Sequence, residues 1–280
     1  MIPIFDTHAH LDLEPFSEDF DAVIHRLESG TLPVVSDELP SQPIQMTGVL
    51  LPGIDAQSSY RCVELAQRLP IFHAAAAIHP NSVVNATDHD WKIITELAFR
   101  DDVVAIGETG LDRYWDDTPI EQQINALLKH INLAVRTAKP IQIHCRDAWD
   151  DLLPILRHAV KEQGLTGIIH AFSGEPEQAA ECIELGFYLS FAGSVTYRNA
   201  KFASLWESAK IVPINRLLVE TDSPYMPPHP LRGKLKRNEP ILAVMVAQRL
   251  AELRGVTLAQ IAEATTQNAF QILCANDISQ

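Results

Sequence analysis

The feature that most constrains the fold is a regular alternation along the chain. Short apolar runs, β-branched or continuously apolar, alternate with longer amphipathic segments for most of the 280 residues. A strand buried on both faces gives such a run, and a helix packed on a sheet gives such a segment. The predicted strands are Ile2–Phe5, Gly48–Leu51, Phe72–Ala77, Val103–Ile106, Ile141–Ile143, Gly167–Ile169, Phe187–Ser190 and Leu217–Val219.

Helices are predicted between these strands and after the last one. The amphipathic segments are Ser17–Glu28, Gln57–Arg68, Asp88–Phe99, Ile120–Thr137, Ala148–Glu162, Pro176–Leu185, Pro240–Arg254 and Thr257–Leu273. Eight strands alternating with helices indicate an α/β fold, a (β/α)₈ TIM barrel formed by residues 1–280 as a single domain. A doubly wound open sheet gives a similar pattern, so periodicity alone leaves both architectures open.

One segment interrupts the alternation. Ser29–Gln45 contains three prolines and several serines between the first predicted helix and the second predicted strand. Such a composition is typical of an extended surface loop, so we predict a loop insertion at 29–45.

Composition limits the possible location and partners of the chain. No apolar run approaches the roughly 18 residues of a membrane helix, the N-terminus carries no basic leader, and the four cysteines form no C-x-x-C pair. These features predict a cytoplasmic protein without membrane contact, and nothing indicates an obligate protein partner. The net charge of −14 argues against a general nucleic-acid binder. Bound divalent cations can nevertheless dominate the field inside one cleft.

Strongly polar residues follow the apolar runs where the strands should end. The first run leads into His8-Ala9-His10, and later runs end at Glu108, His144, His170 and Glu220-Thr221-Asp222. The carboxyl ends of barrel strands converge on one face, where active sites are built. In extended chain, His8 and His10 point to the same side and can hold one cation.

The donor set predicts a metal site at this end of the barrel. Imidazoles with carboxylates suit zinc, manganese, iron or a similar ion. Catalytic ions take three or four protein ligands, so six ligands with one bridging carboxylate can hold two ions. We therefore expect two divalent cations per chain (Zn, Mg or Mn), held by His8, His10, Glu108, His144, His170 and Asp222.

The other histidines are weaker candidates. His25, His130 and His158 fall inside predicted helices, which favours a solvated or packing role. His73 lies early in a strand, at the wrong end for catalysis. His79 ends the third strand and is a candidate substrate contact.

With these residues placed, the sequence resembles the TatD family of metal-dependent deoxyribonucleases, in the amidohydrolase-like superfamily. The resemblance covers nearly the whole chain, and its blocks keep the family's order. GETGLD, IHAFSG and ETDSP together are highly specific. The matching blocks are FDTHAHLD (5–12), IHP (78–80), AIGETGLD (105–112), PIQIHCRDA (140–148), GIIHAFSG (167–174), LGFYLSFAG (185–193) and LLVETDSPYMPP (217–228).

The resemblance implies a (β/α)₈ barrel and a nucleic-acid phosphodiester, DNA in an exonuclease-like reaction, as substrate. It implies the same six metal positions, with Glu108 bridging the two ions. His8, His10 and Asp222 would bind one ion, and His144 and His170 the other. Asp222 and Glu108 are then the candidate catalytic residues, with Asp222 accepting the proton of the attacking water.

Residues around the metal positions are assigned supporting roles. Glu220 should point the same way as Asp222 in the eighth strand and orient a metal ligand from behind it. Two departures from the family stand nearby: Arg113 occupies a position where relatives often have Tyr, and LRGKLKRNEP (231–240) carries Leu235 and Lys236 as extra residues. The candidate substrate contacts are His79, Arg113, Arg146, Arg232, Lys234 and Arg237.

Two other functions compete with nucleic-acid hydrolysis. The same scaffold can hydrolyse an amide, a lactone or a small phosphoester. Glu108, in place of a lysine that could be carbamylated, disfavours many amide hydrolases but not lactonases. A catalytically silent binding protein is the other alternative, and the full ligand set argues against it.

Overall fold

Eight parallel strands form the centre of the molecule, each hydrogen-bonded to the next in chain order. The structure, a computed structural model, describes residues 1–34 and 39–274. The strands are β1 (Ile2–Asp6), β2 (Ile44–Pro52), β3 (Phe72–Ala75), β4 (Val103–Asp112), β5 (Ile141–Arg146), β6 (Gly167–Ile169), β7 (Tyr188–Phe191) and β8 (Leu217–Val219).

Hydrogen bonds just beyond β1 and β8 close the sheet. The Thr7 amide donates to Val219 O at 3.1 Å, and the Asp222 amide donates to His8 O at 2.9 Å. Such closure confirms the predicted (β/α)₈ barrel and rules out the doubly wound open sheet.

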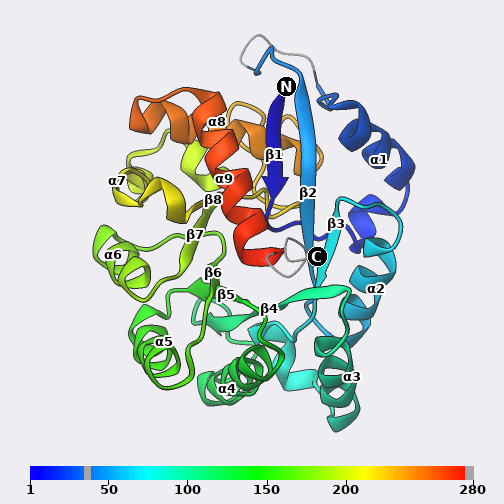
Figure 1. Ribbon diagram of the computed structural model, residues 1–280, viewed down its shortest axis with the longest axis vertical. Coiled ribbons are helices and arrows are strands. Elements are labelled where there is room, and N and C mark those ends of the chain that lie inside the picture. The colour runs from blue at the N-terminus through cyan, green and yellow to red at the C-terminus, as the bar shows by residue number, and fades with distance from the viewer. Residues whose placement is uncertain (35–38, 275–280) are drawn as a thin grey trace.

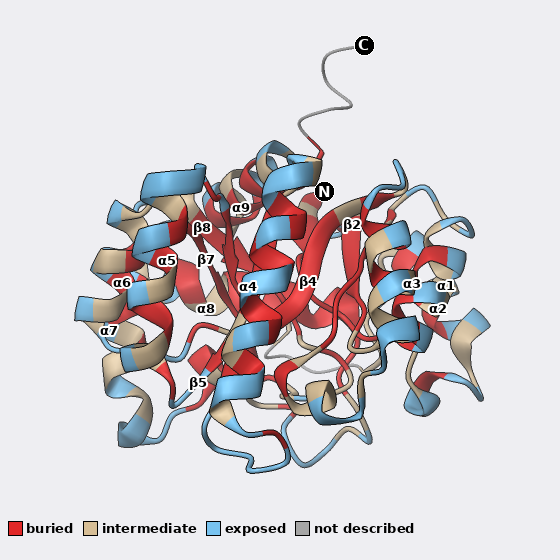
Figure 2. Ribbon diagram, turned by 90° about the horizontal axis from the view of Figure 1, so that it is seen from below, coloured by how far each residue is buried: buried red, intermediate tan, exposed pale blue. Residues whose placement is uncertain are grey.

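Helices surround the barrel (Figure 1). Figure 2 shows buried strands inside a shell of helices whose outer faces are exposed. None of the described helices is long and apolar enough to span a membrane. The helices are α1 (Phe20–Ser29), α2 (Ala56–Ala66), α3 (Asp88–Ala98), α4 (Ile120–Thr137), α5 (Trp149–Gln163), α6 (Pro176–Glu184), α7 (Ala203–Ile211), α8 (Ala243–Arg254) and α9 (Leu258–Leu273).

Four strands are longer than the sequence pattern predicts, and two of them, β2 and β4, extend furthest. β2 begins at Ile44, because Ile44 and Met46 are buried while Gln45 between them is exposed. Residues 44–45 of the predicted loop therefore belong to β2, and Ser29 ends α1. Residues 35–38 of that loop lie outside the described residues.

β4 continues past Ile106 to Asp112. Gly110 makes this extension possible, since its φ is +147° and a Cβ there would lie 1.9 Å from the backbone oxygen of His144. Only glycine permits β4 and β5 to approach so closely at this point.

The amino-terminal end of the barrel is closed by α9, which packs against β1 and β8. The Thr266 hydroxyl donates to Pro3 O, and the Asn268 amide donates to Leu217 O, at the first residues of these strands. The barrel interior is apolar here and joins the end of α9 in one cluster, made of Phe5, Leu50, Ala75, Ala105, Ile168, Tyr188, Leu218, Ala269, Leu273 and Cys274.

Candidate metal centre

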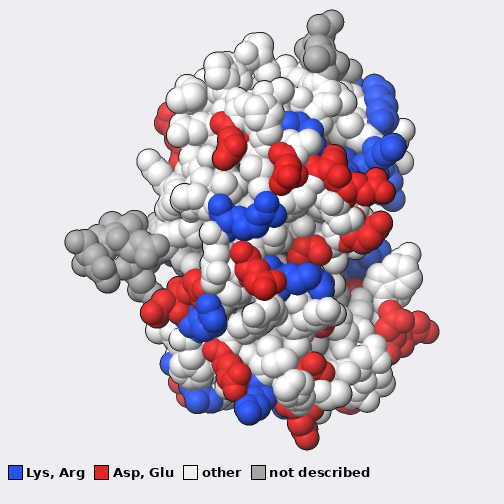
Figure 3. Space-filling model, turned by 90° about the vertical axis from the view of Figure 1, so that its right-hand side faces the viewer, with Lys and Arg blue, Asp and Glu red and all other residues white. Residues whose placement is uncertain are grey.

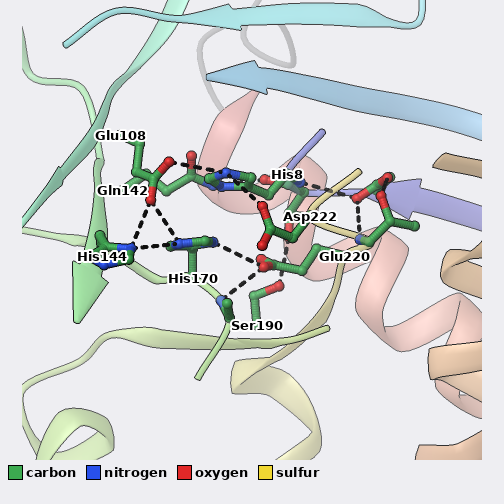
Figure 4. A network of polar contacts seen from close by, with 12 residues as sticks. His8, Glu108, Gln142, His144, His170, Ser190, Glu220 and Asp222 are labelled. Atoms are coloured by element: carbon green, nitrogen blue, oxygen red, sulfur yellow. Dashed lines mark hydrogen bonds and ion pairs between the residues drawn. The ribbon is translucent and has the colours of Figure 1, made fainter. Parts of the chain in front are cut away.

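The opposite end of the barrel brings the six predicted metal-binding residues together. Figure 4 labels five of them: His8, Glu108, His144, His170 and Asp222. β4 carries Glu108, β5 carries His144, and the segments after β1, β6 and β8 carry the others. Four of the six are buried, whereas His144 and Asp222 are partly exposed. The site is therefore open on the side of these two residues.

The two carboxylate oxygens of Glu108 face two different groups of imidazoles. Oε2 lies 3.3 Å from His8 Nε2 and 3.6 Å from His10 Nε2. Oε1 lies 2.9 Å from both His144 Nδ1 and His170 Nε2. Glu108 thus divides the centre into two halves.

Asp222 and His79 complete these halves. Asp222 Oδ1 lies 3.7 Å from His8 Nε2 and 3.6 Å from His10 Nε2, on the Oε2 side. His79 Nε2 lies 3.4 Å from Glu108 Oε1, on the other side. Within the described residues, three sets of donors lie close enough together to hold a cation: His8–His10–Glu108, His8–His170–Glu220 and His79–Glu108–His144.

The protonation of three histidines, His8, His10 and His79, fits a cation. Burial lowers the pKa of His8, His10 and His79, so each favours a neutral ring with a free lone pair. His8 Nε2 and His10 Nε2 are only 3.0 Å apart. Two neutral nitrogens so close repel each other unless a proton or a cation lies between them, and a divalent cation can accept both lone pairs.

The pKa values of the two carboxylates Glu108 and Asp222 are shifted in opposite directions. Burial acts to raise the pKa of Glu108, but His170, His79 and His8 together hold it well below its usual value. Burial raises the pKa of Asp222 to about 6, with the neighbouring His170 acting in the opposite direction. Glu108 is therefore a permanent anion, whereas Asp222 can gain a proton near neutral pH.

His170 and His144 are each oriented by a carboxylate on the side of the ring away from Glu108. Glu220 Oε1 lies 3.0 Å from His170 Nδ1 and also accepts from the Ala171 amide at 2.8 Å. Asp112 Oδ2 lies 3.0 Å from His144 Nε2. A carboxylate behind a ligating imidazole fixes its tautomer and ring orientation. Despite burial, Glu108 and Glu220 raise the pKa of His170 well above its usual value.

Sequence reasoning did not assign Asp112 or Asp6 to the site. Asp112 lies in the part of β4 beyond the predicted strand, opposite Arg146 in β5. Asp6 accepts hydrogen bonds from the His8 and Thr221 amides, which joins the two metal-binding segments at the barrel seam. The alternation continuing from Glu108 through Gly110 to Asp112 was the available signal.

The predicted substrate contacts lie in different surroundings. Arg113 forms a bidentate ion pair with Asp151 of α5, at 2.6 and 2.9 Å. The Arg146 guanidinium lies 3.7 Å from the centre of the Tyr114 ring.

The basic residues of the segment after β8 also differ in their contacts. The Arg232 guanidinium lies 4.4 Å from the centre of the Tyr197 ring, and Lys234 is exposed. Arg237 donates to Asp19 at 2.8 Å and to Glu239 at 3.2 Å. Arg237 therefore also connects this segment to the start of α1.

Two other histidines have structural surroundings. His130, buried on α4, accepts from the Ile78 amide at 3.1 Å and lies 2.8 Å from the Thr109 hydroxyl. His73 lies at the amino-terminal end of the barrel, where its ring stacks on Phe5. Both placements agree with the packing role and the wrong-end position predicted for them.

Comparison with known proteins gives a consistent result over the full barrel. The family model described as TatD related DNase matches residues 5–273. The chain is 38% identical over 273 residues to the uncharacterized metal-dependent hydrolase YabD of Bacillus subtilis, covering 98% of this chain and 100% of YabD. It is 31% identical over 269 residues to the 3'-5' ssDNA/RNA exonuclease TatD of Citrobacter rodentium, covering 95% and 96% of the two chains.

A solved structure agrees with both. The TatD homologue YJJV of Escherichia coli K12 superposes with a TM-score of 0.84 at 28% identity, covering 97% of this chain and 98% of that one. The fold, the convergent histidines and carboxylates and these matches lead to one conclusion: the chain belongs to the TatD family of metal-dependent hydrolases.

Proposed function

We propose that the protein is a metal-dependent phosphodiesterase that hydrolyses nucleic acid, DNA above all, with two divalent cations per chain. The observation that carries the proposal is the division of the histidines by Glu108. One oxygen faces His8 and His10, and the other faces His144 and His170. A carboxylate shared in this way is the arrangement expected of a ligand that bridges two ions.

The residues would divide between the ions as their positions suggest. His8, His10 and Asp222 would hold one, His144 and His170 the other, and Glu108 both. When bound, such ions lower the pKa of an attacking water and neutralise charge on a phosphoryl group. Zn would suit the imidazole nitrogens, whereas Mg and Mn would be held mainly through the oxygens of Glu108 and Asp222.

The protein's own residues would position and deprotonate the reactants. The side chain of Asp222 is 15% exposed, so its carboxylate is reachable from the open side of the site. Before a cation binds, burial raises the pKa of Asp222 to about 6; a bound cation would keep the carboxylate ionised, the form that accepts a proton. Asp222 would take the proton of the attacking water, while Glu220 and Asp112 keep His170 and His144 in place.

The relative from Citrobacter, named as an exonuclease of single-stranded DNA and RNA, supports a nucleic-acid substrate. His79 beside Glu108 and the cations Arg113, Arg146, Arg232, Lys234 and Arg237 are the proposed substrate contacts. Because two of these cations already form ion pairs with Asp151, Asp19 or Glu239, we expect their contributions to differ.

A small uncharged ester or lactone is the second candidate substrate, and the surface charge favours it. The net charge is −14. Figure 3 shows Lys and Arg interspersed with Asp and Glu on the face that carries α1 to α3. A protein without a broad basic surface binds DNA only through local positive charge.

Elemental analysis after chelation and controlled reloading tests the dinuclear centre. The expected result is saturation at two ions per chain, and saturation at one or fewer would refute it. The reloaded protein is then assayed on labelled single-stranded DNA, duplex DNA, an RNA oligomer, and panels of esters and lactones, with Asp222→Asn as the control of reduced turnover. Hydrolysis of esters or lactones alone would replace the nuclease proposal.

Variants of the basic segment separate the two substrates. Arg232, Lys234 and Arg237 are each changed to Gln, singly and together. If DNA is the substrate, each lost phosphate contact should lower the slope of log affinity against log salt by roughly one. Ester hydrolysis should hardly change. An equal loss on both substrates would mean that the segment only supports the fold.

A further inference from the structure

Two large aromatic rings are exposed at the metal-binding end of the barrel. Tyr114 is 55% exposed and Trp115 is 50% exposed, directly after β4. Their ring centres are 4.9 Å apart with the planes nearly perpendicular, at 87°. Adjacent exposed rings beside a catalytic centre are a common feature of ligand-binding surfaces.

The backbone of these two residues is fixed to the metal centre by one carboxylate. Asp112 Oδ1 accepts from the Tyr114 amide at 2.8 Å and from the Trp115 amide at 3.0 Å. The other oxygen, Oδ2, lies 3.0 Å from His144 Nε2. The rings are thus held in a defined place, one side chain away from a proposed metal ligand.

A cation accompanies the rings. Arg146, two residues after His144 in β5, is exposed, and its guanidinium lies 3.7 Å from the Tyr114 ring centre and 5.9 Å from that of Trp115. Stacking on Tyr114 restrains the guanidinium while leaving its N–H groups available to a phosphate.

We propose that Tyr114, Trp115 and Arg146 form a base-stacking platform for an unpaired nucleobase of a single-stranded substrate. Aromatic rings beside a cation are how proteins bind single strands without sequence preference: the base stacks and the cation contacts the backbone. The platform would hold the strand with a phosphodiester at the metal centre. This inference rests on the proposed nuclease function.

The surrounding charges favour a single strand over a duplex. Asp116 and Asp117 follow Trp115, and Asp147 follows Arg146. These carboxylates oppose the dense phosphates of two strands, and the bases of a duplex are covered by stacking and pairing. A single strand can present a base to the rings and one phosphate to Arg146. Attraction to the rings must therefore supply most of the binding at this place.

The test combines removal of the ring with removal of the base. Trp115→Ala and wild type, both loaded with Mn²⁺, are assayed on a single-stranded oligonucleotide and on the same strand with consecutive abasic sites. Loss of one stacked base should lower kcat/KM on the normal strand by about tenfold. The abasic strand should react equally with both proteins, and Trp115→Phe should restore most of the loss.

Phe99→Ala is the matched control. Phe99 is 51% exposed, and the Arg136 guanidinium lies 5.3 Å from its ring centre, but it follows α3 and precedes β4, at the other end of the barrel. The Phe99→Ala substitution should leave kcat/KM unchanged on both the normal and the abasic strand. Arg146→Gln should lower the salt slope of binding by at most about one, whereas Trp115→Ala should leave the slope unchanged.

Two outcomes would overturn the platform: equal losses on the normal and abasic strands, which would indicate a folding role, or no loss on either. Failure of the nuclease function itself is distinct, because wild type would then cleave neither strand. In that case, fluorescence anisotropy of a labelled strand on metal-loaded Asp222→Asn, with and without Trp115→Ala, decides the question. Equal affinities would refute the platform.

Discussion

The two ends of the barrel are built from the same strands but have opposite chemistry. At the amino-terminal end, Phe5, Leu218 and Leu273 belong to one apolar cluster under α9. At the carboxyl end, His8, Glu108 and His170 are buried within ion-pair distance of one another. One end stabilises the fold by burial, and the other concentrates buried polar groups that cost stability unless they are paired. We therefore expect changes at the amino-terminal end to lower stability and changes at the carboxyl end to lower activity.

The largest effect should follow from changing Glu108, the proposed bridge between two ions. Glu108→Gln keeps the volume but removes the charge that faces His8, His10, His144 and His170. Loss of an ion costs several kcal/mol of transition-state stabilisation, so kcat/KM should fall by about 10³-fold or more. Metal content, measured in parallel, should fall below two ions per chain. Near-normal rates with full metal content would contradict the bridging role.

A change at the amino-terminal end of the barrel should lower stability. Leu273→Ala removes a buried side chain from the cluster under α9. The free energy of unfolding should fall by about 2–5 kcal/mol, the usual cost of Leu→Ala in a core. Turnover per folded molecule should stay within about twofold, since no strand end near the metals moves. Urea unfolding followed by assay of the folded fraction measures both. A large loss of kcat would mean that the two ends are coupled.

Asp222→Asn should give an intermediate effect at the catalytic end. The change is nearly isosteric, so the barrel should fold and keep most of its substrate affinity. Turnover should fall by about 10²-fold, the scale of a lost general base. Single-turnover kinetics under saturating metal isolates the chemical step. A rate close to wild type would exclude Asp222 as the proton acceptor.

His130 is a buried polar group near the carboxyl end for which we expect a role in stability and none in catalysis. Burial lowers its pKa to about 3, whereas an unfolded chain has a value of about 6.5. Between these values the unfolded state binds a proton that the folded state does not. Stability should therefore be complete above about pH 6.5 and fall with decreasing pH, by up to about 1.4 kcal/mol per unit.

His130→Gln removes this one titration and keeps the others. Its free energy of unfolding, measured with urea from pH 7 to pH 4.5, should fall less steeply than that of wild type. Its activity at pH 7.5, corrected for the folded fraction, should change little because His130 contacts Ile78 and Thr109 rather than the metal centre. If the free energies of unfolding of wild type and His130→Gln fell equally with decreasing pH, the lowered pKa of His130 would be contradicted.

The same contrast explains what the sequence could predict. The barrel and the six convergent residues were predictable, because a buried parallel strand is a continuous apolar run and its carboxyl end is marked by the first polar residue. The position of Asp112 was not predictable, because the apolar run ends at Ile106 whereas Gly110 lets β4 continue beside β5. The start of β2 at Ile44 is not marked by a continuous apolar run, because one face of that segment is exposed and its pattern alternates. Ion pairs such as Arg113–Asp151 join segments that are distant in the sequence, so a local sequence pattern does not predict them.

The smallest expected difference compares matched ion pairs at the two ends. Arg113 holds Asp151 at the carboxyl end, and Arg100 holds Asp102 at the amino-terminal end; both pairs are bidentate and exposed. Such pairs contribute at most about 1 kcal/mol, so Arg113→Gln and Arg100→Gln should each change the free energy of unfolding by less than that.

Activity should nevertheless distinguish them. Arg113 lies between Asp112, which orients His144, and the exposed ring of Tyr114, so losing its pair with α5 loosens the segment that positions both. Arg113→Gln should therefore lower kcat/KM on single-stranded DNA by roughly threefold, an energy below 1 kcal/mol. Asp151→Asn should have the same effect if the pair itself matters. If Arg113 instead contacts a phosphate, Arg113→Gln alone should also flatten the salt dependence, while Asp151→Asn would not. Arg100→Gln should leave kcat/KM unchanged, because Arg100 and Asp102 precede β4 at the amino-terminal end and contact no residue of the candidate metal centre through this pair.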